Sequence, residues 1–266
     1  MSRICVTCGA QYPTDSVPGV CRICADQRQW VPATGQQWTD LDTMQAAGHR
    51  LELRQVEPGL SKVLVSPSVG IGQSGYLLQT LAGNVLWDAP AYLNDQAVAL
   101  VRGRGPVAAV AASHPHFYGV MAAWGDVLDA PVLVAAEDAE WVTCPSERLT
   151  TWAGAHDVAP GVRLVRCGGH FAGSAVLHWA DGADGAGALL AGDTIFPVAA
   201  QGWVSFMYSF PNYLPLSAAE VEGIARAVRD LAFDRIYGGF KTLDSGARAA
   251  VERSAARYIR RVTGSP

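Results

Sequence analysis

The sequence has 266 residues, of which half are apolar and 17% are charged, and its net charge at pH 7 is −4. This length suits one large domain with a small appendage. The acidic balance offers no broad basic surface, so we consider nucleic acid an unlikely partner. No apolar run approaches the ~20 residues of a membrane span, and the start, MSRICVTCGAQ, lacks the apolar core of a signal peptide. We therefore expect a cytoplasmic protein with no membrane partner, whose cysteines are metal ligands or free thiols.

The N-terminal segment contains two C-x-x-C pairs, Cys5/Cys8 and Cys21/Cys24, with twelve residues between them. Each pair can wrap a tight turn around one metal ion, and four thiolates in a tetrahedron are typical of a closed structural Zn²⁺ site. A redox C-x-x-C or four unrelated thiols are the alternatives. A segment of about 29 residues buries little core, so metal binding should stabilise it directly. We predict a zinc knuckle over 1–35. This zinc-ribbon-like segment would hold the N-terminus, dock on the main domain or on a partner protein, or mediate self-association.

A polar stretch, ATGQQWTD at 33–40, is interpreted as a linker to a second domain over 45–266. The runs LELRQVEP, KVLVSPSV, GYLLQTL and NVLWDA are short, apolar or alternating, and cut by Gly, Pro or Asn, as is typical of strands. A hairpin turn is expected at 82–84. AYLNDQAVALVRG and residues 118–129 indicate helices, and PVAAVAAS and PVLVAA indicate buried strands.

A second block rich in strands follows, with RLVRC, SAVLHWA and ALLAGDTI separated by turn-like glycine segments. Ser217 and Glu220 form a capping box that predicts the start of a helix, FDRIY indicates a strand, and a last helix is expected at roughly 245–261. Two such halves, each with helices, favour a layered α/β sandwich over an alternating Rossmann sheet. No dinucleotide or P-loop motif supports a nucleotide cofactor.

Histidines gather after one of the predicted strands, in SHPHFYG at 113–119. In extended backbone His114 and His116 project to the same side, although H-x-H alone is a weak metal motif. His170 lies in the glycine-rich turn GGHFAGS, and Asp193 ends the strand ALLAG. All are metal-competent residues at strand ends, where loops collect functional groups, so we expect them to converge on one ion.

The order, spacing and context of these residues resemble the metallo-β-lactamase superfamily over roughly residues 50–260. That family has an H-x-H-x-D-H loop after a strand, a later G-G-H turn and an Asp in a G-D motif. The resemblance implies an α/β (α+β) fold, the four-layer αββα sandwich, with the site at one rim of the sheets. It implies that His114, His116 and His170 bind the first metal and that Asp193 matches the carboxylate that bridges two metals. GYLLQTLAGNVLWDA resembles the early hairpin of the family, whose final Asp matches Asp88; this residue would orient a metal-binding histidine or cap the strand end.

The sequence departs from the family at the ligands of the second metal. Tyr118 and Gly119 stand where the H-x-H-x-D-H loop has its Asp and last His, and Phe240 stands at the final His of the family. We therefore expect one ion in this site. Tyr118 would donate a hydrogen bond to a developing oxyanion or simply pack. Asp193 would complete the ligand set or accept a proton from the metal-bound water.

The ligand set and the resemblance together imply a metal-dependent hydrolase. Zinc-bound hydroxide would attack an ester, thioester, lactone or amide in a small molecule. Two alternatives remain open: Fe²⁺ at the same residues in an oxygenase, or an inactive binding scaffold whose zinc knuckle docks a partner. The aromatic segment at 202–216 would line a substrate pocket or cover the core. The other histidines and cysteines considered are predicted to be structural or surface residues, namely His156, His178, Cys144 and Cys167.

Overall fold

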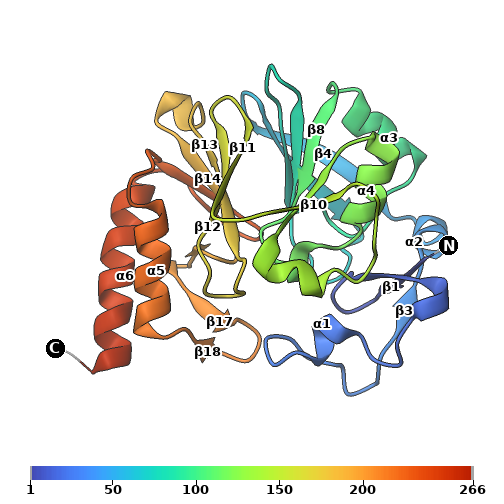
Figure 1. Ribbon diagram of the computed structural model, residues 1–266, viewed down its shortest axis with the longest axis horizontal. Helices are drawn as coiled ribbons and strands as arrows, with labels where there is room; N and C mark the ends of the chain where they lie inside the picture. The colour runs from blue at the N-terminus through green and yellow to red at the C-terminus, as the bar shows by residue number, and fades with distance from the viewer. Residues whose placement is uncertain (1, 265–266) are drawn as a thin grey trace. The chain divides into compact units, whose positions relative to one another are not determined.

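The computed structural model describes residues 2–264 and shows a chain of two compact units (Figure 1). The first unit, unit 1, runs to Val134 and also includes Ala139–Thr151. The second unit, unit 2, contains Ala135–Asp138 and the chain from Trp152 onward. Among residues 2–264, no helix is long and apolar enough to cross a membrane.

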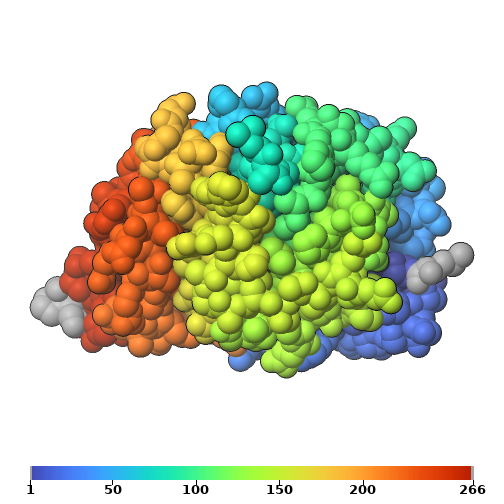
Figure 2. Space-filling view, turned by 45° about the horizontal axis from the view of Figure 1, so that its top comes forward, coloured from blue at the N-terminus to red at the C-terminus, as the bar shows by residue number. Residues whose placement is uncertain are grey.

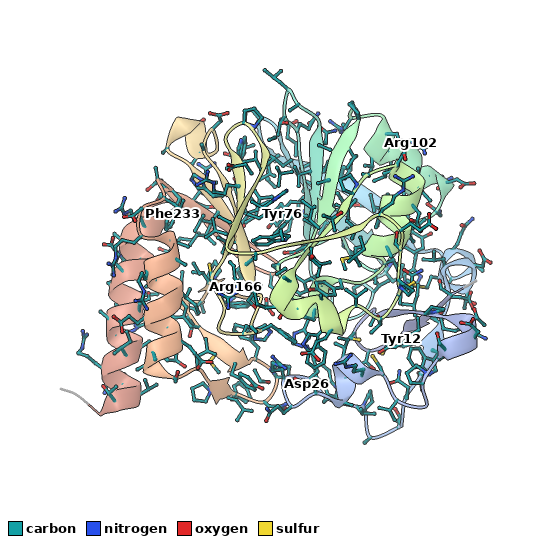
Figure 3. All side chains as sticks on the ribbon, viewed as in Figure 1. Tyr12, Asp26, Tyr76, Arg102, Arg166 and Phe233 are labelled. Carbon is teal, nitrogen blue, oxygen red and sulfur yellow. The ribbon has the colours of Figure 1, made fainter. Side chains whose placement is uncertain are left out.

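The N-terminal part of unit 1 is a small sheet with the strand order β2-β1-β3. It consists of β1 (Ser2–Cys5), β2 (Gln11–Pro13) and β3 (Trp38–Thr39). The short helices η1 (Thr14–Ser16) and α1 (Arg22–Ala25) lie between β2 and β3 in the sequence. Strand β3 pairs with β1, and its Trp38 ring meets the ring of Tyr12, labelled in Figure 3, edge to face. The interpretation of 33–40 as a plain linker was therefore wrong, because part of this stretch completes the sheet of the knuckle.

The main sheet of unit 1 has the strand order β10-β9-β8-β7-β6-β5-β4. Its strands are β4 (Arg50–Glu57), β5 (Leu60–Ser66), β6 (Gly75–Leu78), β7 (Asn84–Trp87), β8 (Val107–Ala111), β9 (Val132–Ala135) and β10 (Leu149–Trp152). Strands β4 to β7 pair antiparallel, whereas β7, β8 and β9 are parallel. Besides η1 and α1, this unit contains the helices α2 (Leu41–Ala46), α3 (Asp95–Arg102) and α4 (Met121–Leu128) and the 3-10 turn η2 (Pro115–Phe117). The 3-10 helix η3 (Ala136–Trp141) begins in unit 2 and ends in unit 1.

Parallel strands need crossover connections, and α3 and α4 lie in the connections on either side of β8. Helix α3 begins four residues later than the start of the predicted segment because the side chain of Asn94 accepts a hydrogen bond from the amide of Ala97 and caps it there. The segment 113–119 lies between the end of β8 and α4. The fold thus places the histidine segment at the carboxyl end of a buried parallel strand, where functional groups collect.

Unit 2 contains a sheet with the strand order β11-β12-β13-β14-β19-β20. Its strands are β11 (Ala155–Ala159), β12 (Val162–Arg166), β13 (Ala175–Trp179), β14 (Ala188–Gly192), β19 (Arg235–Gly238) and β20 (Thr242–Leu243). Two small hairpins, a 3-10 turn and two helices complete the unit. They are β15 (Phe196–Pro197) with β16 (Val204–Ser205), β17 (Met207–Ser209) with β18 (Leu214–Pro215), η4 (Ala183–Gly185), α5 (Ala218–Val228) and α6 (Ala247–Thr263).

Helices α5 and α6 lie side by side, as Figures 1 and 2 show in orange and red. The predicted capping box at the start of α5 is confirmed, since Ser217 and Glu220 exchange hydrogen bonds between side chain and backbone. Its apolar stripe, with Val221 and Ile224, packs into the core of the unit. Helix α5 lies in the connection between the parallel strands β14 and β19, and Asp193 follows directly after β14.

Candidate metal centres

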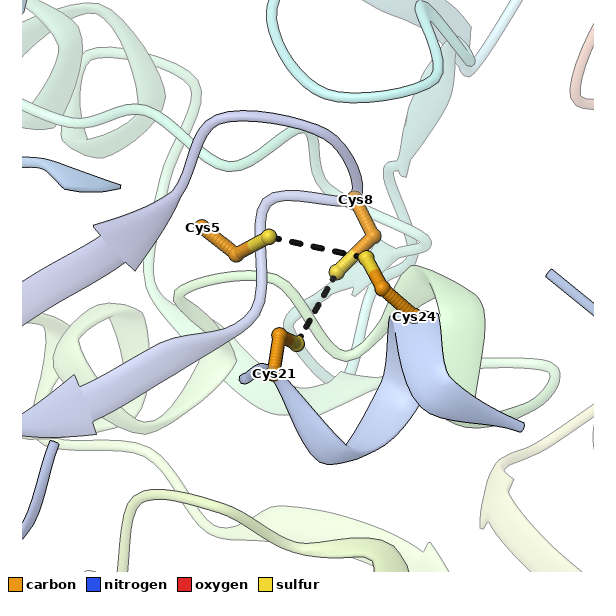
Figure 4. Close-up of side chains that lie close together, drawn as sticks. All are labelled: Cys5, Cys8, Cys21 and Cys24. Carbon is orange, nitrogen blue, oxygen red and sulfur yellow. Dashed lines mark hydrogen bonds between the residues drawn. The ribbon is translucent and has the colours of Figure 1, made fainter. Parts of the chain in front are cut away.

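The predicted knuckle cysteines lie together in the structure (Figure 4). The sulfur atoms of Cys5 and Cys24 are 3.6 Å apart, and so are those of Cys8 and Cys21. Zn–S bonds of about 2.3 Å place the sulfurs of a tetrahedral site about 3.8 Å apart. All four side chains are buried, and their ligand atoms lie within 4.8 Å of one another. The geometry and the four soft donors therefore fit one zinc ion.

Local backbone structure explains how each C-x-x-C pair turns. Gly9 has φ +83 and donates its amide to the carbonyl of Cys5 at 2.8 Å, which closes the first turn. Cys21 precedes α1, and its carbonyl accepts the amide of Ala25 at 2.9 Å. The φ of Gly9 lies in the left-handed region, which glycine adopts without steric cost. The first cysteine pair therefore depends on Gly9, and the second on one turn of helix.

Polar groups around the knuckle stabilise negative sulfur. Hydrogen bonds from Cys21 and Cys24 hold the pKa of Cys5 far below its ordinary value, and Cys24 lowers the pKa of Cys21 to about 7. Gln36 donates its amide to the Cys5 sulfur at 3.1 Å. The pKa of Cys8 is raised, first by its hydrogen bond with Cys21, because further negative charge in the cluster is unfavourable. A divalent cation would remove this conflict.

The histidine segment is anchored at its first residue. Asp88 is buried, and its Oδ1 accepts the amide of Ser113 at 2.6 Å. The Ser113 hydroxyl lies 2.8 Å from Nδ1 of His114, so Nε2 is the ring nitrogen of His114 that can bind a metal. This contact is compatible with both roles predicted for Asp88, orienting a metal-binding histidine or capping the strand end, and each stays a prediction. His116 lies in the 3-10 turn η2, and its ring centroid is 5.1 Å from that of His114. The turn, and not strand alternation, brings the two rings together.

His170 and Asp193 are also buried. Nδ1–H of His170 donates to the carbonyl of Met207 at 3.1 Å, which again leaves Nε2 for a metal. Burial raises the pKa of the Asp193 carboxyl to about 7. A carboxylate in such surroundings is stabilised by a nearby cation. Both residues thus have the orientation or environment that a metal ligand needs.

The structure brings the predicted residues His114, His116, His170 and Asp193 into one group. Each offers one ligand atom, and these atoms all lie within 4.8 Å of one another. Three imidazoles and one carboxylate fit Zn²⁺ or Fe²⁺ by the chemistry of the donors. The residues therefore suit the binding of a metal ion.

Tyr118 is buried and packs in the apolar core cluster of unit 1. That position favours a packing role, and hydrogen bonding to an oxyanion stays a prediction. Nε2–H of His178 donates a hydrogen bond to the carbonyl of Ala232 at 2.8 Å, as expected of a structural histidine. His156, expected in a loop, lies on strand β11 beside the ion pair of Asp157 and Arg163.

Several residues next to the metal group were not identified from the sequence. Asp138 is buried and accepts the amide of Gly173 at 2.8 Å, which fixes the far end of the His170 turn. Two aromatic rings follow one another beside His170. The ring centroid of Phe210 is 5.9 Å from that of His170, and the ring centroid of Phe196 is 4.5 Å from that of Phe210. Phe210 comes from the aromatic segment 202–216, for which a pocket wall was one prediction. A lone Asp in AAEDAEW carries no motif, so no local signal could have identified Asp138.

Comparisons with known proteins agree with this architecture, although no family model matches the chain. The chain is 42% identical over 261 residues to the uncharacterized protein YmaE of Bacillus subtilis (strain 168), covering 97% of this chain and 95% of YmaE. Among solved structures, it is similar to TMB-1 (TM-score 0.60, 16% identity, 78% of this chain and 97% of that one). It is also similar to the DIM-1 metallo-β-lactamase (TM-score 0.58, 11% identity, 79% of this chain and 97% of that one). A metallo-β-lactamase from Hirschia baltica is similar as well (TM-score 0.54, 18% identity, 78% of this chain and 97% of that one).

The fold, with the histidine and aspartate group in place, is that of the metallo-β-lactamases, as the sequence predicted. The four-cysteine cluster lies near the N-terminus of this fold. At 42% identity over nearly its whole length, the chain belongs to the same protein family as YmaE.

Proposed function

We propose that this protein is a metal-dependent hydrolase that uses one zinc ion at His114, His116, His170 and Asp193. Its substrate would be an ester, thioester, lactone or amide in a small molecule. The observation that carries the proposal is the buried group of three imidazoles and one carboxylate on a metallo-β-lactamase fold. A zinc ion bound by neutral histidines would supply Lewis acidity and lower the pKa of a water molecule to about 7.

The residues of the chain would orient the ligands and handle the proton. The Ser113 hydroxyl and the Met207 carbonyl engage Nδ1 of His114 and His170, respectively, which directs Nε2 of each ring to the ion. Asp193 would complete the ligand set or accept the proton of the attacking water. Such fixed side chains need no rearrangement during the reaction, which favours catalysis.

We assign a second, structural zinc ion to Cys5, Cys8, Cys21 and Cys24. The sulfur separations of 3.6 Å and the burial of all four side chains support this assignment. A closed site with four thiolates has no open position for a substrate, so its role is structural. The assignment fits the predicted cytoplasmic location, where thiols stay reduced.

The test is hydrolysis of a panel of p-nitrophenyl esters, thioesters, lactones and amides by zinc-loaded protein. We expect turnover of at least one class, its loss on chelation or in His116→Ala, and its return when zinc is restored to the wild type. If zinc-loaded protein is inactive while the Fe²⁺ form consumes O₂, the hydrolase proposal is wrong and the oxygenase alternative holds. Hydrolysis that persists at full rate in His116→Ala would also contradict it.

A further inference from the structure

The first turn of the knuckle packs directly against two loops of unit 1. A Cβ atom added to Gly9 would lie 2.5 Å from the Cβ of Ala91. A Cβ atom added to Gly70 would lie 2.9 Å from the carbonyl carbon of Cys8. Contacts this short do not occur between real Cβ atoms and their neighbours, so glycine is required on both sides. The backbone of the cysteine turn therefore lies directly against the methyl group of Ala91 on one side and the backbone of Gly70 on the other.

The loop that contains Ala91, and so contacts Gly9, also contacts both ends of the histidine segment 113–119. At one end, Asp88 accepts the amide of Ser113 at 2.6 Å. At the other end, a Cβ atom added to Gly119 would lie 3.4 Å from the Cα of Ala91 and from the carbonyl of Ala89. Residues 88–91, which we call the bridging loop, thus contact the knuckle on one side and residues 113 and 119 on the other.

The bridging loop is buried, with Ala89 at 5% and Ala91 at 2% exposure. Both alanines belong to the same apolar core cluster as Phe117 of the histidine segment and Ile4 of strand β1. Close-packed interiors transmit a displacement instead of absorbing it. A shift of the Cys8–Gly9 turn would therefore move Ala91 and, through it, the segment that carries His114 and His116.

Further contacts attach the knuckle to unit 1 away from the bridging loop. Thr143 donates its hydroxyl to the carbonyl of Gln11 at 2.7 Å, and the guanidinium of Arg22 lies 4.7 Å from the ring centre of Trp141. These contacts hold the knuckle against the unit, but they do not determine the shape of its cysteine turn. That shape depends on the cysteine ligands, because so short a segment has little core of its own.

We propose that the metal-loaded knuckle positions the histidine segment through the contact of Gly9 with Ala91 and so sets the metal affinity of the histidine site. The proposal rests on the proposed function for its consequence, since a displaced segment would bind the ion of the hydrolase more weakly. Cys8, Gly9, Ala91 and Gly119 are positioning residues in this scheme. Residues that orient metal ligands typically change metal affinity about 10- to 100-fold when they are altered.

The test uses Gly9→Ala in the full chain, with Gly35→Ala as the matched control. Gly35 in the same knuckle has φ +86, and a Cβ atom added there meets nothing within 4 Å. We expect Gly9→Ala to keep its knuckle metal while its zinc dissociation constant at the histidine site, measured by chelator competition, rises at least about tenfold. Gly35→Ala, which has the same left-handed backbone but no clash, should keep the affinity of the wild type. In Gly9→Ala/Ala91→Gly, which removes the clashing Cβ, most of the affinity should return.

Hydrogen exchange of residues 113–119 gives a second readout that needs no metal in the histidine site. It should be faster in Gly9→Ala, and also in Ala91→Gly alone, which loses the contact without a clash and stays informative if Gly9→Ala does not fold. Unchanged exchange and affinity in Ala91→Gly, or equal effects in Gly9→Ala and Gly35→Ala, would overturn the proposal. A wild type that binds no metal at its histidines would refute the proposed function, while the exchange comparison would still decide the coupling.

Discussion

At the scale of single residues, two of the candidate ligands, His114 and His170, each have a hydrogen-bond partner on Nδ1. His114 contacts the Ser113 hydroxyl through Nδ1, and His170 donates from Nδ1–H to the Met207 carbonyl. Because a carbonyl only accepts, it selects the tautomer of His170 with the lone pair on Nε2, the form that binds a divalent ion, and the Ser113 hydroxyl is compatible with the same tautomer of His114. Asp88 and Asp138 accept hydrogen bonds from backbone amides near these histidines. Asp88 accepts the amide of Ser113, next to His114, and Asp138 accepts the amide of Gly173, at the end of the His170 turn.

The two cysteines outside the knuckle are predicted to be unreactive, and Cys167 tests this most sharply. Burial raises its pKa to about 12. A raised pKa keeps the thiol protonated to higher pH, so at pH 8 only about one in ten thousand would be thiolate. We expect no labelling of Cys167 by iodoacetamide at pH 8 in native protein, followed by peptide mass spectrometry, and a rate that still rises above pH 10.

Metal-stripped protein provides the comparison, because the knuckle has little core of its own and its cysteines are no longer protected by an ion. Cys21 should then be labelled much faster than Cys167 at pH 8. Labelling of Cys167 at the rate of a small-molecule thiol would show that its surroundings are not as the structure has them.

At the scale of elements, helix α5 supports the turn that presents His170. A Cβ atom added to Gly169 would lie 2.7 Å from Cδ1 of Ile224 on α5 and 3.1 Å from Cδ1 of Leu216. Gly169 also has φ +86. The turn therefore packs directly on the side-chain ends of Ile224 and Leu216, and its positive φ favours glycine.

We predict that Gly169→Ala weakens zinc binding at the histidine site at least about tenfold, because the clash displaces the turn and its histidine. The matched control is Gly185→Ala, at φ +88 with nothing within 4 Å of an added Cβ. Both variants should lose roughly 1–2 kcal/mol of unfolding free energy in urea from the left-handed backbone, but only Gly169→Ala should lose affinity. Equal metal affinity in the two variants would show that α5 does not position His170.

At the scale of the whole molecule, the sequence predicted most of what local pattern determines. Alternation and apolar runs indicated the strands, and the capping box at Ser217 indicated the start of α5. Cysteine spacing and the positions of His114, His170 and Asp193 at strand ends indicated two groups of ligands, both of which the structure brings together. Residue type and local order were sufficient in these cases because each signal lies within a few residues.

The remaining features depend on contacts between distant segments, which leave no local pattern. Strand β3 was missed because its two residues are defined by pairing with β1. Gln36 binds the Cys5 sulfur from 31 residues away, and Asp138 reaches Gly173 from 35 residues away. The bridging loop likewise gains its meaning from the knuckle and the histidine segment that pack on either side of it. Such partners were not identifiable from spacing alone.

The central claim is that this chain holds one ion at its histidines and one at its cysteines. The most direct measurement is elemental analysis of protein purified without added metal, for the wild type, His116→Ala and the control His178→Ala. We predict about two metal ions per chain in the wild type and the control, zinc in both sites, and about one in His116→Ala. An unchanged total in His116→Ala, or three ions in the wild type, would contradict the claim.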